Sequence, residues 1–335
     1  MASLISFTKK GIYCPQANVY IDPWGKVDKA LITHGHSDHA RRGHQSYLCH
    51  QNSVNILKSR LGKISVQGIS FEKEIYINGV RITFFPAGHI VGSAQIKLEN
   101  KFESWVISGD YKVQSDSLAT NFVPVKCDYF VTESTFGLPV FKWPDPASVF
   151  EEINHWWQDN QSKNITSILC AYSLGKAQRI IQSIDHSIGP VLTHSAVEKM
   201  NEAIRDTGLT LKETSLLNNQ DKDILKKSLI ICPPGSLEKT EKMVPSASVA
   251  MASGWMSLRG ARRRRNMDRG FVLSDHADWN GLNMAITETG AQKVYVTHGY
   301  TDVFSKWLNH SGVESQTVET AFEGETLEVV KSESV

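Results

Sequence analysis

This sequence of 335 residues lacks closely paired cysteines and long apolar runs, and its net charge is close to zero. Its five cysteines are odd in number and show no CxxC spacing, which argues against a disulfide framework and against a thiolate zinc site. Lys and Arg number 36 against 35 Asp and Glu, so a polyanionic partner must be attracted by a local patch rather than by the whole surface. No apolar run reaches the roughly 18 residues of a membrane span, and the N-terminus lacks a signal-peptide pattern. These absences predict a cytoplasmic protein of reduced cysteines with no membrane partner.

Histidine, by contrast, is concentrated in the run His34-Gly35-His36-Ser37-Asp38-His39. The run follows residues 27–33, which read as a short buried strand, so it lies at a strand's C-terminal end, where α/β proteins place their chemistry. A lone histidine is usually packed or exposed to solvent. Four ligand-type side chains buried without metal would instead form an unpaired polar cluster that costs several kcal/mol. The run therefore predicts metal binding, and its geometry suits two ions.

Three more apolar segments end in ligand-type residues, namely His89, Asp110 and His298. A carboxylate that bridges two divalent cations holds them roughly 3.5 to 4 Å apart, the spacing at which they clamp attacking and leaving oxygens together. We predict that Asp110 is this bridge and that the nucleophile is a hydroxide between the ions. The predicted ligands are His34, His36 and His89 for one ion, and Asp38, His39 and His298 for the other.

The hydrophobic pattern divides the chain into three stretches. Residues 3–133 alternate short strands with turns and predict a mostly antiparallel sheet with one helix at 52–60. Three prolines between residues 138 and 146 break this pattern, and Asp145-Pro146 predicts the N-cap and first residue of a helix. A βα rhythm follows, which indicates a parallel sheet covered by helices. We predict a first domain that is made of residues 1–138 and 263–335 and is interrupted by an inserted α/β domain, residues 139–262.

The order of these motifs resembles the metallo-β-lactamase superfamily, and the inserted domain resembles the β-CASP domain of its nucleic-acid-processing members. The resemblance implies an αββα sandwich with an inserted β-CASP α/β domain. It extends over nearly the whole chain to the bacterial ligase-associated DNA exonucleases. The stretches that carry this closer similarity are GIYCPQANVYIDPWGKVDKALITHGHSDHA, AYSLGKAQRI and SGWMSLRGARRRRNMDRGFVLSDHADW.

The resemblance also implies roles for residues outside the ligand set. Asp22 would orient the histidine run by hydrogen bonding, without touching metal. His276 would contact the scissile phosphate and protonate the leaving oxygen, with Glu133 holding its imidazole, because a carboxylate favours the protonated form. A purely structural His–Glu pair is the alternative. Asp38, Glu133 and His276 are thus the predicted catalytic residues.

One dense cationic run, at 259–265, is the candidate patch for nucleic acid. A charge run is often only a solvated face, but its position just before Ser274 and His276 favours contact with phosphates. Residues 172–176 form a strand-to-helix turn that can hold a phosphate, although they are not a Walker sequence. The predicted nucleic-acid contacts are Ser173, Lys176, Ser274, Arg259, Arg262, Arg263, Arg264 and Arg265.

The sequence leaves several readings open. The first is a DNA exonuclease in repair, functionally associated with a DNA ligase and a repair helicase. The second is a β-CASP ribonuclease, because a histidine such as His298 in the last motif is typical of RNA-processing members, whereas the acidic Asp275 is closer to the DNA enzymes. A small-molecule hydrolase would not need so large an inserted domain, and binding subunits of the family have lost ligands that this chain keeps. The histidine-rich ligand set favours Zn²⁺, and Mn²⁺ is also compatible.

Overall fold

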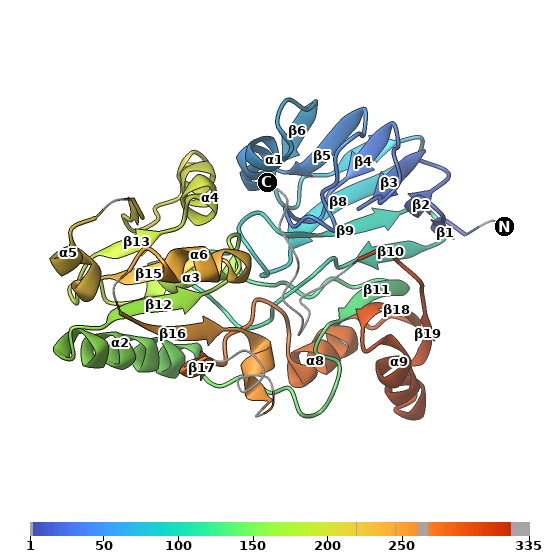
Figure 1. Ribbon diagram of the computed structural model, residues 1–335. Coiled ribbons are helices and arrows are strands. Elements are labelled where there is room, and N and C mark those ends of the chain that lie inside the picture. The colour runs from blue at the N-terminus through green and yellow to red at the C-terminus, as the bar shows by residue number, and fades with distance from the viewer. Residues whose placement is uncertain (1–2, 219, 245, 259, 261–266, 323–335) are drawn as a thin grey trace. The chain divides into compact units, whose positions relative to one another are not determined.

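The computed structural model describes residues 3–218, 220–244, 246–258, 260 and 267–322, and in these the chain divides into two units (Figure 1). The first unit takes in the residues up to 141 and those from 276 on, whereas the second takes in residues 142–275. The predicted end of the insertion at residue 262 precedes strand β17 (Arg269–Phe271), which pairs with β16 (Ala247–Ala252) of the second unit.

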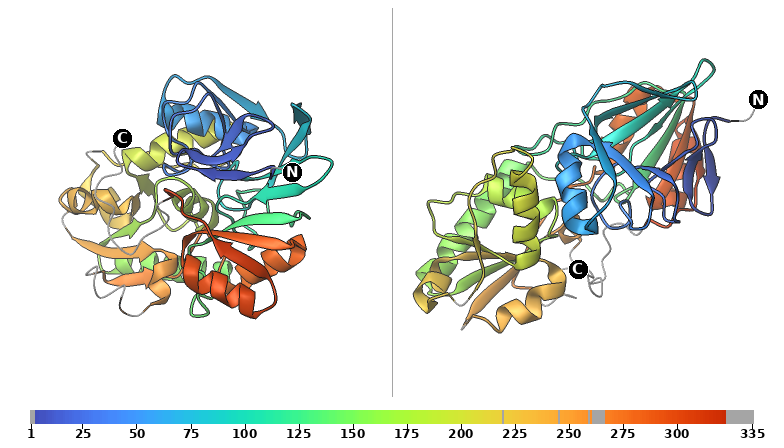
Figure 2. Two further views of the ribbon diagram at one scale, coloured as in Figure 1. Left: turned by 90° about the vertical axis from the view of Figure 1, so that its right-hand side faces the viewer. Right: turned by 90° about the horizontal axis from the view of Figure 1, so that it is seen from above.

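Two mixed sheets make up the first unit, and Figure 2 shows them from two further directions. The first sheet has the order β1-β2-β3-β4-β5-β6, with bounds Ser6–Thr8, Gly11–Cys14, Val19–Ile21, Lys29–Leu31, Ser46–His50 and Val66–Ile69. The second sheet has the order β19-β18-β11-β10-β9-β8-β7. Its strands β7 to β11 are Ile75–Ile77, Val80–Pro86, Ala94–Glu99, Ser104–Ile107 and Tyr129–Ser134, and β18 and β19 are Lys293–Gly299 and Glu314–Thr317.

The prediction of one mostly antiparallel sheet for residues 3–133 is confirmed only in part, because these residues contribute to two mixed sheets, with five antiparallel and four parallel strand pairs. Strands β18 and β19 add further parallel pairs to the second sheet. The sequence gives little sign of the parallel pairs, because β11 finds its parallel neighbour β18 only after the whole second unit has been traversed. Local periodicity carries no record of such a partner.

Apolar side chains fill the space between the two sheets and the space under the flanking helices. In β10, Trp105 and Ile107 face the core between the sheets, whereas Val106 faces helix α8 (Trp279–Thr289). This alternation follows from the two-residue period of a strand and makes β10 apolar on both faces. Helix α1 (Val54–Leu61), preceded by the 3₁₀ turn η1 (Gln51–Ser53), packs on the first sheet, and α8 and α9 (Thr301–His310) pack on the second. The layers of this unit are therefore helix, sheet, sheet and helix.

The second unit is built on one parallel sheet with the order β14-β13-β15-β12-β16-β17, as the βα rhythm predicts. Helix α2 (Pro146–Ser162) begins where predicted, since the Asp145 side chain accepts a hydrogen bond from the backbone N–H of Ala147. The remaining strands are β12 (Thr166–Cys170), β13 (Val191–Thr193), β14 (Ser215–Leu216) and β15 (Leu229–Cys232). Among its described residues, the unit also forms α3 (Lys176–Ser183), α4 (Ser195–Arg205), α5 (Lys222–Lys227), η2 (Pro234–Ser236), α6 (Leu237–Glu241) and η3 (Gly254–Ser257).

All five cysteines lie in the described part of the chain, where they are buried and form no disulfide. No helix of the described residues is both long enough and apolar enough to cross a membrane.

Candidate metal centre

Strand ends of the first unit converge on one edge. Asp22 follows β3, the histidine run follows β4, and Asp110 follows β10. Strands β3 and β4 are parallel, as are β10, β11 and β18, so their carboxyl ends lie on the same side of their sheets. His89 follows β8 and His298 lies near the end of β18. Residues that are far apart in the sequence therefore meet at this edge.

The Asp22 carboxylate is hydrogen-bonded to Thr33, just before the histidine run, and to His39 at its end. It adopts a φ of 43°, an unusual backbone conformation that Asp tolerates better than most residues. Its carboxylate accepts hydrogen bonds from the backbone N–H of Thr33 at 2.8 Å and from Nδ1 of His39 at 2.7 Å. With the Nδ1 proton given to Asp22, Nε2 of His39 is left as the atom that can bind a cation. This is the orienting role that the resemblance implies for Asp22.

The Asp110 carboxylate lies between two groups of histidines. Its Oδ2 is 3.5 Å from Nε2 of His34 and 3.8 Å from Nε2 of His89. Nε2 of His89 is in turn 3.0 Å from Nδ1 of His36. Ligand atoms of these four residues all lie within 4.8 Å of one another, so they could hold one metal ion. We refer to them as the first ligand group.

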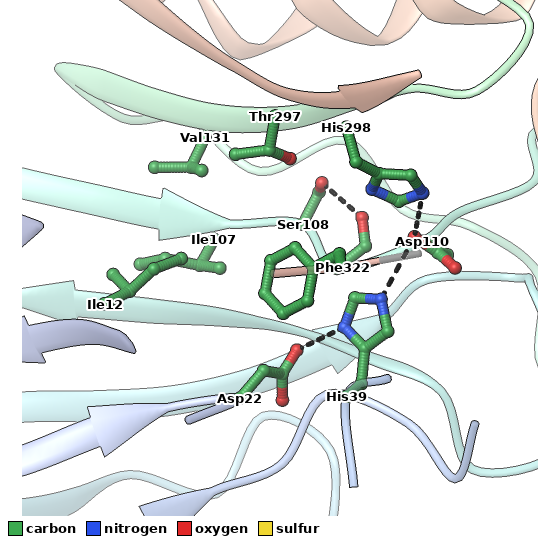
Figure 3. Close-up of a pocket in the computed structure, with 11 residues that line it drawn as sticks. Ile12, Asp22, His39, Ile107, Ser108, Asp110, Val131, Thr297, His298 and Phe322 are labelled. Carbon is green, nitrogen blue, oxygen red and sulfur yellow. Dashed lines mark hydrogen bonds and ion pairs between the residues drawn. The ribbon is translucent and has the colours of Figure 1, made fainter. Parts of the chain in front are cut away.

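The other oxygen of Asp110 faces the second ligand group (Figure 3). Oδ1 is 3.5 Å from Nε2 of His39 and 3.7 Å from Nε2 of His298, and these three residues could hold a second ion. The carboxylate of Asp38 is 3.4 Å from Nε2 of His39. The second ligand group, as we use the term, comprises His39, His298, Asp38 and Asp110. The structure thus brings together the seven residues predicted as metal ligands, with Asp38 placed in the second ligand group by its contact with His39.

Buried atoms without hydrogen bonds provide a test of whether this site fits divalent cations. Nε2 of His34, Nε2 of His39 and Oδ1 of Asp110 are buried and have no hydrogen-bond partner among the described residues, and the same holds for Nδ1 of His298. Such atoms are costly inside a protein unless something binds them. The atoms are imidazole nitrogens and a carboxylate oxygen, which are the donors that zinc and manganese take in proteins. The residues present therefore fit divalent cations.

The pKa shifts indicate which side chains of the cluster favour their charged forms. Burial lowers the pKa of His34 well below its usual range, and the neighbouring His39 lowers it further. Burial also opposes the charge on His39, but Asp38 and Asp110 outweigh it and hold the pKa of His39 well above its usual range. Burial would raise the pKa of Asp110, yet His39 and His298 outweigh it and hold that pKa well below the usual range. A cation that entered would therefore compete with the proton on His39.

Glu133 and His276 form a buried pair beside the ligand groups. Nδ1 of His276 lies 3.0 Å from Oε1 and 2.9 Å from Oε2 of Glu133. Oε1 also accepts a hydrogen bond from the backbone N–H of Tyr111 at 2.9 Å, next to Asp110 in the chain. The ring centroids of His276 and His89 are 4.7 Å apart. Glu133 thus ties the segment of Asp110 to His276, at a place where His276 is only 4% exposed.

The predicted nucleic-acid contacts lie elsewhere in the chain. Ser173, Lys176 and Ser274 belong to the second unit, whereas the ligand groups belong to the first. Lys176 is 1% exposed, with its ammonium 5.0 Å from the centre of the Tyr172 ring. Ser274 is 2% exposed, and its carbonyl accepts a hydrogen bond from Arg179 at 2.6 Å. Five predicted contacts lie outside the described residues, namely Arg259, Arg262, Arg263, Arg264 and Arg265.

Sequence reasoning missed three side chains that touch the ligands. Thr33 reaches Nδ1 of His34 at 3.1 Å, and Thr135 reaches Nε2 of His298 at 3.1 Å. Both adjoin motifs that the sequence analysis named, so their positions next to a ligand strand could have indicated them. Phe322 stacks on the ring of His39. It belongs to no motif, and nothing in the local sequence points to it.

Comparisons with known proteins complete the description of the site. No family model matches the chain. A "Probable DNA ligase" of Opitutus terrae is 28% identical over 312 residues, which are 92% of this chain and 30% of that protein. An "Endoribonuclease YSH1" of Mycosarcoma maydis is 23% identical, covering 84% of this chain and 42% of its own length. A "Cleavage and polyadenylation specificity factor 73" of Drosophila melanogaster is 28% identical over 36% of this chain and 18% of its own length.

The chain therefore spans less than half the length of these relatives. Among solved structures, the crystal structure of a protein of unknown function from Enterococcus faecalis matches with a TM-score of 0.58 at 10% identity. The match covers 88% of this chain and 80% of that one. At this identity the likeness concerns the fold alone.

Proposed function

We propose, from the premise that this chain is a β-CASP member of the metallo-β-lactamase superfamily, that it hydrolyses phosphodiester bonds of DNA with the help of two divalent cations. The relatives confirm the superfamily resemblance that the motifs indicate. We assign the first unit to the αββα metallo-β-lactamase sandwich and the second unit to the inserted β-CASP domain. The reaction class that we propose is exonucleolytic cleavage in DNA repair.

The observation that carries this proposal is the position of Asp110 between the two ligand groups. Its two oxygens lie 3.5 Å from Nε2 of His34 and 3.5 Å from Nε2 of His39. When bound, divalent cations supply positive charge to a phosphoryl group and make water acidic enough to attack at neutral pH. Small-molecule hydrolysis could use the same cations, so the nuclease assignment depends on the neighbouring residues.

His276 is the group that we assign to the leaving oxygen. Nδ1–H of the protonated imidazole donates a hydrogen bond to Glu133, so Nε2–H is the group that gives a proton to the departing alkoxide. The buried carboxylate also holds Nδ1 of the imidazole in place, because both of its oxygens are within 3.0 Å of that atom. Protonation of a poor leaving group is needed for phosphodiester cleavage, and it is this chemistry that the pair supplies.

DNA is favoured as the substrate because the alignment to the protein named as a DNA ligase takes in 92% of the chain. That alignment also supports functional association with a DNA ligase, and the repair helicase remains an expectation of the same kind. We place the phosphate contacts on Ser173, Lys176, Ser274 and the arginine run at 259–265. RNA is the second candidate, because several relatives are named as endoribonucleases. Zn²⁺ is the cation we favour, with Mn²⁺ as the alternative.

One experiment separates these possibilities. The protein is incubated with end-labelled single-stranded DNA, double-stranded DNA and RNA of matched sequence, each in Zn²⁺, Mn²⁺ or Mg²⁺. We expect DNA to be shortened from an end, which gives a ladder that decays to mononucleotides. Internal cuts would contradict the exonuclease assignment, and preferential loss of RNA would overturn the choice of DNA. Hydrolysis of a lactam or thioester in place of both nucleic acids would overturn the nuclease assignment.

A further inference from the structure

Residues 318–322, which we call the return segment, run from the end of β19 back to the metal centre. The backbone N–H of Val318 donates to the carbonyl of Val296 in β18 at 2.9 Å. Further along, Nη2 of Arg41 donates to the carbonyl of Ala321 at 2.6 Å. Nε of the same Arg41 donates to the carbonyl of Asp38 at 3.3 Å. Arg41 therefore binds the return segment to the histidine run itself.

The return segment ends its described course with Phe322 against the second ligand group. The ring of Phe322 is stacked on that of His39, with centroids 4.3 Å apart and planes 10° apart. It also meets the ring of His298 edge-on, at 6.0 Å and 68°. Trp24 packs on Phe322 in a T-shaped contact, at 5.6 Å and 89°. Figure 3 shows the ring of Phe322 beside His39 in the pocket that His298 and Asp110 also line.

The stacking of Phe322 restricts the tilt of the His39 ring, which the hydrogen bond from His39 to Asp22 leaves free. The bond from Nδ1 to Asp22 fixes one in-plane atom at 2.7 Å, so the ring can still tilt about that contact. A flat apolar ring stacked on the imidazole removes the tilt and keeps Nε2 directed at Asp110. The same pocket is lined by the apolar Ile12, Ile107 and Val131 as well as by polar residues such as Asp22 and Thr297, so Phe322 lies in a pocket of mixed character.

We propose that Phe322 is a positioning residue that sets the affinity of the second ligand group for its cation. The inference rests on the proposed two-cation function and adds to it a side chain that touches no cation. The ring contacts that the structure describes for Phe322 go to two residues of the second ligand group, His39 and His298, and to Trp24. Its loss should therefore weaken the second cation position more than the first, whose His34 and His89 are positioned by other contacts.

The test measures Zn²⁺ binding directly rather than turnover. Metal-free wild type, Phe322→Ala and Phe322→Tyr are titrated with Zn²⁺ against a chromophoric chelator, and bound metal is counted by mass spectrometry after dialysis. We expect two Zn²⁺ per wild-type chain. Phe322→Ala should keep one binding step and weaken the other by about 10- to 100-fold, as removal of an outer partner of a metal ligand does. Phe322→Tyr keeps the aromatic plane and should restore both steps.

Two further variants distinguish an effect on the second ligand group from a general loss of folded structure. Phe322→Leu fills much of the same apolar space without a ring plane, so it should also weaken one step if stacking is what matters. Phe102→Ala removes a 60% exposed phenylalanine of the same unit and should leave both steps unchanged. Wild-type Zn²⁺ affinity in Phe322→Ala and Phe322→Leu would overturn the inference. A wild-type chain that binds fewer than two Zn²⁺ would instead overturn the proposed function.

Discussion

At the scale of single residues, His276 is the side chain whose proposed role separates chemistry from metal binding. It is held by Glu133 and belongs to neither ligand group, although its ring nitrogen lies within 4.8 Å of carboxylate oxygens of Glu133 and Asp110, a cluster that could itself hold an ion. We expect His276→Ala to keep the wild-type content of bound metal while turnover falls by about 10²- to 10⁴-fold, the range for loss of a general acid. Parallel measurements of metal content and DNA cleavage check this.

A conservative variant sharpens that prediction. Glu133→Gln keeps the size of the partner but removes the charge that favours a protonated imidazole. A general acid acts in its protonated form, so loss of this charge should move the alkaline limb of the pH profile to lower pH, which a merely structural pair would not produce. Full turnover in His276→Ala would exclude the general-acid role.

Residue patterns also show what could be predicted from the sequence. The four ligand-type side chains at 34–39 are dense enough to indicate metal by themselves, and the strand before them indicates where they lie. Phe322 could not be found in this way, because its contact with His39 depends on how the chain returns after β19. A stacking partner has no spacing rule, and an apolar residue near the surface is ordinary.

At the scale of elements, the hairpin β7–β8 has a turn signal in its sequence, the pair Asn78-Gly79. Residues 74–85 contain apolar and β-branched residues typical of a strand, but the structure turns the chain at Asn78-Gly79. Both residues have positive φ, 49° and 78°, which is the backbone that the Asn-Gly pair favours in a two-residue hairpin loop. The parallel pairing of β10, β11 and β18, by contrast, has no local signal at all.

The end of β8 depends on a glycine. Gly88 has a φ of 73°, and a Cβ added there would overlap the carbonyl oxygen of Lys112. Gly88→Ala should therefore lower the free energy of unfolding by well over about 2 kcal/mol and displace His89, because it adds a backbone clash to the strain of the left-handed conformation. Urea unfolding and Zn²⁺ titration check both effects.

A matched glycine isolates the clash in that experiment. Gly208 has a φ of 87°, and a Cβ added there would meet nothing within 4 Å. Gly208→Ala should cost only about 1 kcal/mol and leave Zn²⁺ binding unchanged. Equal losses in the two variants would mean that contact with Lys112 plays no part.

His50, at the junction between β5 and η1, should make the stability of the fold sensitive to acid. His50 accepts a hydrogen bond at Nδ1 from the N–H of Asn52 and stacks on Phe71 at 3.7 Å. Burial lowers the pKa of His50 to about 4. An unfolded histidine binds its proton near pH 6.5, so acid stabilises the unfolded chain first. Stability that is present above about pH 6.5 should be lost as the pH falls toward 4, by up to about 3 kcal/mol from this residue.

Replacement of His50 tests that contribution. His50→Asn keeps an acceptor for the N–H of Asn52 but does not titrate. The free energy of unfolding measured in urea should therefore change by about 2 kcal/mol less than in the wild type between about pH 7.5 and 5. The exposed His310 serves as the control, and His310→Asn should retain the wild-type dependence. Identical pH dependence in His50→Asn and wild type would contradict the assignment.

At the scale of the whole molecule, cation binding and folding of the first unit are linked. Its ligand groups lie at the ends of β4, β8, β10 and β18, and buried atoms of His34, His39, Asp110 and His298 have no hydrogen-bond partner in the described chain. A ligand that binds only the folded state adds about 2.7 kcal/mol per site when present at 100 times its Kd. Zn²⁺ should therefore raise the Tm measured by calorimetry, and EDTA should reverse the rise.

Asp110→Asn is the informative variant for this linkage. It removes the charge that both ligand groups share, so most of the Zn²⁺-dependent rise in Tm should disappear. Lys163→Ala, which breaks an exposed ion pair of the second unit with Asp159, should leave the rise intact. A full rise in Asp110→Asn would show that Zn²⁺ binds elsewhere.

The pairing of β11 with β18 has a consequence for how the protein is made. The hydrogen bond from Ser134 to the carbonyl of Thr297 joins residues 163 positions apart, with the whole second unit between them. While a ribosome is still synthesising that unit, β11 has its neighbour β10 on one side and an unsatisfied edge on the other. The two ligand groups are therefore complete only after β18 has been synthesised, and a nascent chain that stops before β18 lacks His298 and leaves that edge of β11 unpaired.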